Sequence, residues 1–322
     1  MIRFTIPSKD LTKEEKIKEL NVQFDSFLTS PALSGIIEIL KDSTTVKPKD
    51  IKNFFFSFDA RRRSNGTSVE RQSIKTPEEL KQIFESNREA LYDFFTELGL
   101  LSINKPLISQ PRHLLILGAS YNACYNRTLG ARRLIDTDEI DTSKLQDISA
   151  LGTYRIIAPV ETKTPVFISS RETEFGVLSD CFTDIFNLKD YQDTFKGGLN
   201  TNEISCIRKF DFSDKTLYRV YSAPSSEPNR RANSEDTYTQ YITDNKLKED
   251  DSCLLITNNV YCNYQFIPFA LKLLNDDLNI DFDIIGCSND QAITKADEFD
   301  PNFYLQVVIS IIDWIYRFKE AF

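Results

Sequence analysis

Short apolar strands that alternate with helices from residue 112 onward constrain the fold of this chain more than any other feature. The first strand is expected at 114–117, four consecutive apolar residues followed by a small-residue turn and a segment of helical periodicity. A strand without alternating polar residues is typical of a parallel sheet that helices cover on both faces. Further strands are expected at 154–158, 217–223, 253–257 and 282–285, and helices near 122–135, 174–187, 235–247, 262–275 and 301–320. The alternation predicts an α/β fold with a Rossmann-like parallel sheet flanked by helices.

The first 105 residues have a different rhythm and predict a helical N-terminal region. Thr12 starts a capping-box pattern ahead of apolar residues at helical spacing, and Thr76-Pro77 marks a later helix start. A linker with two prolines follows. We therefore expect two domains, a helical region at 1–105 and a Rossmann-like α/β domain at 112–322.

The charge of the chain is negative and unevenly distributed. The formal net charge is −9. There are 18 Lys and Arg against 16 Asp and Glu through residue 112, and 21 against 32 beyond it. Such a balance argues against general nucleic-acid binding, which usually needs a basic surface. An acidic domain that binds an anion must gather its cations locally, so paired arginines in the second part are informative.

The sequence argues against several kinds of active site. His113 is the only histidine, and its place beside a proline-containing linker predicts a solvent-exposed side chain without a role in catalysis. Six scattered cysteines without a C-x-x-C pair indicate buried free thiols and a reducing compartment. We find neither a signal peptide nor an apolar run of spanning length, which predicts a cytoplasmic protein without membrane association.

Two polar blocks, 228–238 and 257–265, each follow a predicted strand and run into a predicted helix. That junction lies at the carboxyl edge of a parallel sheet, where ligands bind. Adjacent guanidiniums suit phosphate or carboxylate because Arg offers a planar fork of donors. A solvated loop with a helix N-cap at Asn233 or Ser234 is the alternative for the first block, and tyrosines that pack beneath the loop are the alternative for the second. The candidate ligand-binding residues here are Arg230, Arg231, Asn233, Asp236, Thr257, Tyr261 and Gln265.

Further candidates lie at the same predicted edge. Gly118 and Ala119 follow the first strand, where a glycine lets backbone N–H groups approach a phosphate at a helix N-terminus, and Arg127 lies about two turns into that helix. Neither a G-x-G-x-x-G pattern nor a Walker lysine is present, so a purely structural turn stays open. Glu161 and Glu174 offer carboxylates for acid–base catalysis or a divalent cation, with helix capping as the alternative for the second.

The order of these motifs resembles the YdcF/SanA/ElyC-like family, a Rossmann-like group of mostly uncharacterised bacterial proteins. The resemblance covers roughly residues 112–310 and leaves the helical N-terminus unexplained. It rests on a strand that ends in a small-residue loop with an Arg in the next helix, an acidic residue that opens a later helix, and two polar blocks. In this chain these are Leu117-Gly118-Ala119 with Arg127, Glu172-Thr173-Glu174-Phe175, Arg231 to Thr237, and Thr257 to Gln265. The resemblance implies binding of nucleotide-like molecules such as S-adenosylmethionine.

Taken together, the sequence predicts a protein that binds a nucleotide-like or other phosphorylated small molecule, as a hydrolase or a transferase. Arg127, Arg230 and Arg231 would neutralise the anion, and Glu161 or Glu174 would act as acid or base. A divalent metal stays open as a cofactor, and the apolar helix around Trp314 leaves a homodimer open. The alternative is a non-enzymatic ligand-sensing or interaction module.

Overall fold

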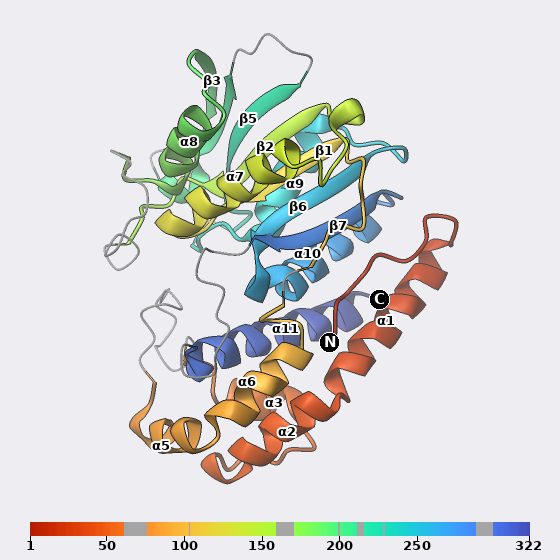
Figure 1. The fold of residues 1–322 in the computed structure, drawn as a ribbon, viewed down its shortest axis with the longest axis vertical. Helices are drawn as coiled ribbons and strands as arrows, with labels where there is room; N and C mark the ends of the chain where they lie inside the picture. The colour runs from red at the N-terminus through yellow and green to blue at the C-terminus, as the bar shows by residue number, and fades with distance from the viewer. Residues whose placement is uncertain are drawn as a thin grey trace. The chain divides into compact units, whose positions relative to one another are not determined.

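The computed structural model describes residues 1–60, 76–102, 104–158, 171–198, 200–210, 216–227, 229–287 and 299–322. The chain forms two compact units (Figure 1). The first consists of Met1–Ser102, Asn259–Ile267 and Asp290–Phe322, and the second of Ile103–Asn258 and Pro268–Asn289. The C-terminal helix therefore belongs to the helical unit, whereas the sequence analysis placed it in the α/β domain.

The first unit is helical. Its first helix begins with the predicted capping box, in which Thr12 accepts from the backbone of Glu15 and the Glu15 side chain accepts from the backbone of Thr12. Its helices are α1 (Lys13–Leu28), α2 (Pro31–Leu40), η1 (Lys41–Ser43), α3 (Ile51–Phe56), α5 (Glu78–Ser86), α6 (Arg88–Glu97), η6 (Asn259–Tyr261), the start of α10 (Cys262–Asn275) and α11 (Pro301–Ala321).

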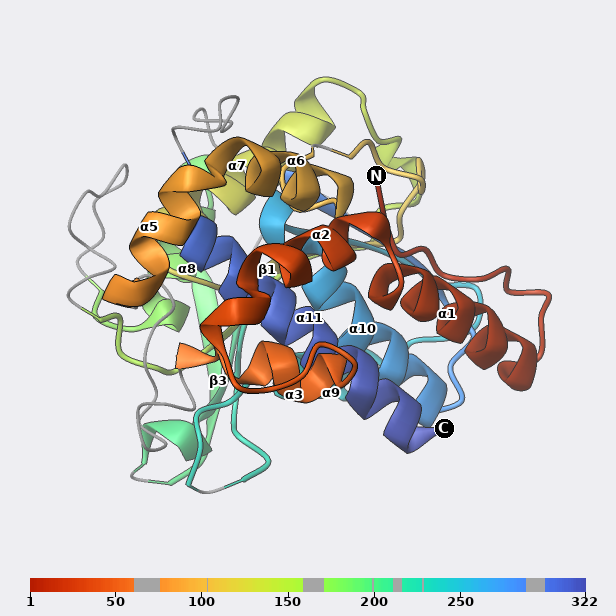
Figure 2. The ribbon, with the colours of Figure 1, turned by 90° about the horizontal axis from the view of Figure 1, so that it is seen from below.

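The core of the first unit forms around α11, which contacts α1, α3 and α6 (Figure 2). Along its central turns Val307, Ile311 and Ile315 are fully buried. A helix that is apolar on nearly every side is stable in water only when other helices surround it. Trp314 is also buried, at 6% exposure, so its side chain packs within the unit.

The second unit contains a seven-stranded, mostly parallel sheet of order β3-β4-β5-β2-β1-β6-β7. The strands from β5 to β7 in that order pair in parallel, and β3 and β4 are antiparallel additions at one edge. The predicted Rossmann-like α/β fold is confirmed. The strands are β1 (His113–Leu117), β2 (Asp147–Thr153), β3 (Tyr191–Lys196), β4 (Ser205–Phe210), β5 (Leu217–Ala223), β6 (Ser252–Asn258) and β7 (Asp281–Cys287).

Helices cover both faces of this sheet (Figure 1). On one face α7 (Tyr121–Asp136) and α8 (Glu174–Ile185) pack against apolar side chains of the central strands, and these residues form the main core. On the other face lie α9 (Ser234–Asn245) and the second part of α10, where Tyr238 and Phe282 both contact the ring of Phe269. Two short turns, η3 (Thr142–Lys144) and η5 (Thr201–Glu203), complete the unit.

The second strand lies earlier in the chain than the sequence analysis predicted. The segment 154–158 was expected as a strand, but β2 is Asp147–Thr153 and ends before it. The actual strand carries small and polar residues, such as Ser149 and Gly152, which have low strand propensity. Burial between helices on both faces outweighs that local preference.

His113 was predicted to be solvent-exposed, and this is wrong. It is the first residue of β1 and is only 6% exposed. Its Nδ1 lies 2.9 Å from the hydroxyl of Tyr241, which donates to Asp147 at 2.7 Å, and Arg219 pairs with that carboxylate at 2.6 Å. The histidine is therefore part of a buried polar network at the amino ends of the strands. Sequence position alone did not reveal this, because the partners come from β2, β5 and α9.

Candidate functional site

Strand β1 has β2 on one side and β6 on the other. The chain continues from β1 through α7 to β2, and returns much later through α9 to β6. The strand order thus changes direction between β1 and β6. In open α/β sheets, ligands bind outside the carboxyl ends of the strands at such a point. The candidate site therefore consists of residues at the carboxyl ends of β1, β2 and β6.

The turn after β1 requires a glycine. The backbone N–H of Gly118 donates to the carbonyl of Leu151 on β2 at 2.7 Å. A Cβ atom on Gly118 would lie 2.8 Å from that same carbonyl oxygen and 2.9 Å from Oε1 of Glu174. Contacts this short are sterically excluded, so a side chain here would displace either the strand or the carboxylate. The glycine lets the Glu174 carboxylate lie directly against the turn.

Glu174 is the first residue of α8, and Thr173 caps that helix through a bond to the backbone of Gly176. The capping role thus falls to Thr173, which leaves the Glu174 side chain for other contacts. Its Oε2 accepts from the backbone N–H and the hydroxyl of Thr153, at 3.0 and 2.7 Å. The residue is only 5% exposed. A fixed, buried carboxylate therefore lies between the ends of β1 and β2.

Two arginines surround the turn. Arg127, 1% exposed, donates to the carbonyls of Leu117 and Gly118 at 2.6 and 2.8 Å and to Oδ1 of Asn258 at 2.7 Å. Arg155 donates to the carbonyl of Ala119 at 2.8 Å.

Three successive carbonyls thus accept from guanidiniums. Nε of Arg155 also lies 3.5 Å from Oε2 of Glu174. With Arg127, Arg155 and Glu174 ionised, the group of three carries one net positive charge within an acidic chain.

Thr257 lies near the end of β6 and is fully buried. Its hydroxyl has no hydrogen-bond partner among the described residues. A buried hydroxyl without a partner costs roughly 1–3 kcal/mol, and an ordered water, an ion or a ligand oxygen can satisfy it. The neighbouring residue, Asn258, accepts from Arg127, which links β6 to the turn after β1.

In the first predicted polar block, the Arg230 side chain forms its hydrogen bonds within its own loop and with the start of α9. Arg230 donates to Asp236 at 2.6 Å and also to Glu227, Ser226 and the carbonyl of Arg231. Burial raises the pKa of Asp236, but Arg230 and nearby hydrogen bonds outweigh it and lower that pKa overall.

The same loop ends at the N-terminus of α9. Asn233 and Asp236 form a reciprocal capping box. Asn233 is therefore the N-cap, as the alternative interpretation of this block had it. The arginine that follows Arg230, Arg231, is exposed.

Several predicted residues lie elsewhere. The loop that carries Arg230 and Arg231 follows β5, two strands from β1, or roughly 10 Å at the usual strand spacing. Tyr261 and Gln265 belong to the first unit, where Tyr261 contacts Phe303 and Gln265 is buried. Glu161 lies outside the described residues.

Neither Arg155 nor Thr153 was predicted from the sequence. Thr153 ends β2, and Arg155 lies two residues beyond it, inside the segment that was expected as a strand. Cys124, in the first turn of α7, is also close to this site, but burial raises the pKa of its thiol to about 12. It stays protonated near neutral pH and is a poor nucleophile there.

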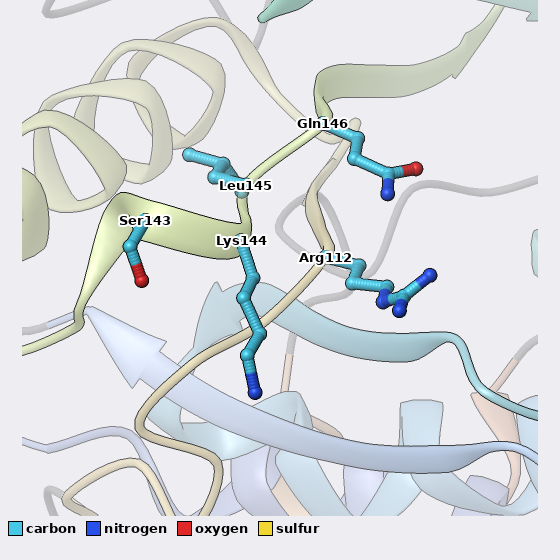
Figure 3. A pocket seen from close by; sticks show the side chains of 5 residues that line it. All are labelled: Arg112, Ser143, Lys144, Leu145 and Gln146. Atoms are coloured by element: carbon cyan, nitrogen blue, oxygen red, sulfur yellow. The ribbon is translucent and has the colours of Figure 1, made fainter.

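A pocket lies at the opposite, amino edge of the sheet (Figure 3). Its volume is about 240 Å³. Arg112 precedes β1 and also pairs with Asp251 at 3.6 Å, and Lys144 ends η3. The lining residues are Arg112, Ser143, Lys144, Leu145 and Gln146. This pocket does not include any residue that the sequence analysis assigned to ligand binding.

The described part of the chain holds no group of three or more His, Cys, Asp or Glu side chains placed to bind a metal ion. Among helices in the described ranges, none has the length and apolar character needed to cross a membrane. Comparison of the chain with protein-family models, with curated proteins and with solved structures gives no match.

Proposed function

We propose that the second unit binds a nucleotide-like or other phosphorylated small molecule at the carboxyl ends of β1, β2 and β6, and acts on it as a hydrolase or a transferase. The observation that carries the proposal is the cluster of Arg127, Arg155 and Glu174 around the Gly118-Ala119 turn. It combines a local positive charge, a turn without side-chain bulk and a buried carboxylate at the point where the strand order reverses. The resemblance to the YdcF/SanA/ElyC-like family stays a prediction.

An anion is the ligand class that these groups favour. The turn leads into α7, a 16-residue helix whose N-terminus carries the positive end of the helix dipole. Arg127 and Arg155 donate to the carbonyls of the turn, so they stabilise its conformation and add positive charge next to it. Thr257 offers a buried hydroxyl that a ligand oxygen would complete.

Glu174 is the group suited to proton transfer. It lies against the turn where the reacting phosphoryl group would sit, and Thr153 fixes one of its oxygens. In the proposed step Glu174 accepts a proton from water or from an acceptor hydroxyl as that oxygen attacks phosphorus. The bond from phosphorus to the leaving group then breaks, and the leaving group takes the electron pair.

Thr257→Val tests the binding site directly. Valine has nearly the same shape but lacks the hydroxyl, which has no partner to lose within the described part of the chain. We expect the melting temperature to be unchanged or higher. We expect affinity for pyrophosphate and ADP, measured by calorimetry, to fall about 10- to 150-fold, the loss of one hydrogen bond to a charged group.

Thr128→Val is the matched control, because Thr128 is equally buried and its hydroxyl donates to the carbonyl of Cys124 within α7. It should lose stability without a specific loss of affinity. Equal affinities for wild type and Thr257→Val would refute the site.

Glu174→Gln distinguishes an enzyme from a non-enzymatic ligand sensor. An enzyme loses turnover of a bound phosphoester and keeps binding it, whereas a sensor shows no turnover in either form.

A further inference from the structure

Strand β3, Tyr191–Lys196, forms one edge of the sheet, and all six of its residues are exposed. Two of them are large and aromatic: Tyr191 is 43% exposed and Phe195 is 55% exposed. An edge strand presents unpaired backbone N–H and C=O groups along its outer side, so an exposed apolar edge is a template for pairing with another strand.

The opposite edge of the same sheet is protected. Both faces of β7 are covered, and its residues from Phe282 to Gly286 are buried. Asp283 of β7 also accepts from the backbone N–H of Leu107, which ties the preceding linker to this strand. Native proteins commonly protect a sheet edge with a covering segment or an inward-pointing charge. Within the described ranges, the contrast singles out β3 as the edge that is open to a partner.

The strand is ordered by its inner neighbour, β4. Asp193 lies directly opposite Arg208, which donates to both oxygens of its carboxylate at 2.8 and 2.7 Å. The guanidinium of Arg208 also lies 3.7 Å from the ring centre of Tyr191. These contacts fix the strand and neutralise the charge at its centre. A strand that is already fixed loses less conformational entropy when it pairs.

We propose that β3 pairs antiparallel with β3 of a second copy of this chain, about a two-fold axis at Asp193. In an antiparallel pair with that symmetry, residues directly opposite each other lie on the same face. Tyr191 then meets Phe195 of the second copy, and Lys196 meets Asp190 of the second copy. Each pair occurs twice.

The charges of the strand favour this partner. Asp190 and Lys196 are both exposed, lie at opposite ends of the strand and carry opposite signs, so antiparallel pairing brings them together at both ends. The pairing also removes the exposed Tyr191 and Phe195 from water. The two central Asp193 carboxylates face each other, and each is held by its own Arg208. The strand therefore complements itself.

Charge reversal tests the pairing on the full chain. We expect sedimentation velocity to show a concentration-dependent dimer. Lys196→Glu and Asp190→Lys each place like charges opposite one another twice, and each should weaken the dimer about tenfold or more. Mixing the two variants makes every pair complementary again. Native mass spectrometry should then show the mixed dimer in preference to either homodimer.

Lys144→Glu is the control, because it makes the same charge change at an exposed position on the amino edge of the sheet, and it should leave the dimer unchanged. Circular dichroism checks that each variant folds. A monomer at every concentration overturns the proposal. So does a dimer that both reversals leave intact, since that dimer would use another surface. A mixture without preference for the mixed dimer overturns the register.

Discussion

Replacement of Asp147 by Asn should destabilise the second unit more than any exposed charge change. Asp147 is the first residue of β2 and is 1% exposed. Its carboxylate accepts from Arg219 at 2.6 and 2.9 Å, from Tyr241 at 2.7 Å and from Ser149 at 2.9 Å. The Asn side chain keeps the volume and one acceptor oxygen but removes the charge.

The expected loss of stability follows from the buried charge that the variant leaves unpaired. Arg219 is 9% exposed, so the variant leaves a buried guanidinium without its counter-ion. Removal of one partner of a buried ion pair costs about 3–5 kcal/mol, against a total stability of roughly 5–15 kcal/mol for a typical domain. Urea unfolding followed by circular dichroism measures this loss. We expect Asp147→Asn to lower the free energy of unfolding by about 3 kcal/mol or more.

Asp136→Asn is the matched control. Asp136 pairs with Arg132 at 2.8 Å on α7, but the two side chains are 50% and 42% exposed. Exposed helical pairs of this spacing contribute about 0.3–0.5 kcal/mol. If Asp147→Asn costs no more than Asp136→Asn, the buried network does not stabilise the fold and the reasoning is refuted.

The pH dependence has a definite sign. Burial alone raises the pKa of Asp147, but His113, Arg219 and Tyr241 outweigh it and hold that pKa below its ordinary value. A depressed pKa contributes stability above the unfolded pKa of about 4, and this contribution is lost as the pH falls through the folded pKa. The difference in stability between wild type and Asp147→Asn should therefore be constant near neutral pH and shrink below about pH 4.

Two further predictions concern single positions. Gly118→Ala should lower stability by about 1–3 kcal/mol in thermal unfolding, because its Cβ meets a backbone carbonyl oxygen at 2.8 Å. Gly198→Ala is the control and should cost less, since its Cβ meets only the end of a flexible side chain. Equal losses of stability in the two variants would contradict the close approach at Gly118. The hydroxyl proton of Tyr241 goes to Asp147, so neutral His113 must carry its own proton on Nδ1. ¹⁵N NMR of this single histidine reads the tautomer, and a proton on Nε2 of the neutral ring would contradict the network.

Four of the seven named strands could be predicted because each contains a short run of mainly apolar residues. The expected segment 217–223 coincides with β5, and those for β1, β6 and β7 fall within the observed strands. β2 could not be placed, since Ser149 and Gly152 look unlike a strand until helices bury them. β3 escaped prediction because it is exposed on both faces and shows no alternation.

The domain boundary and part of the site depended on contacts that no local pattern contains. The final helix has the spacing of an α/β helix, but its apolar surface packs with α1, α3 and α6 of the N-terminal region. Gly118 and Glu174 could be placed from their positions at strand and helix ends. The pairing of Arg230 with Asp236 could not, because it depends on the path of the loop between them. The spacing from Asn233 to Asp236 is a local signal only for the capping box at the start of α9.

The most direct test of the proposed function is a crystal structure of the protein soaked with pyrophosphate. We predict density for the anion at the turn after β1, within hydrogen-bond distance of the Ala119 backbone N–H and of the Thr257 hydroxyl. Density for the anion only at other places, such as the pocket beside Arg112 and Lys144, would contradict the account.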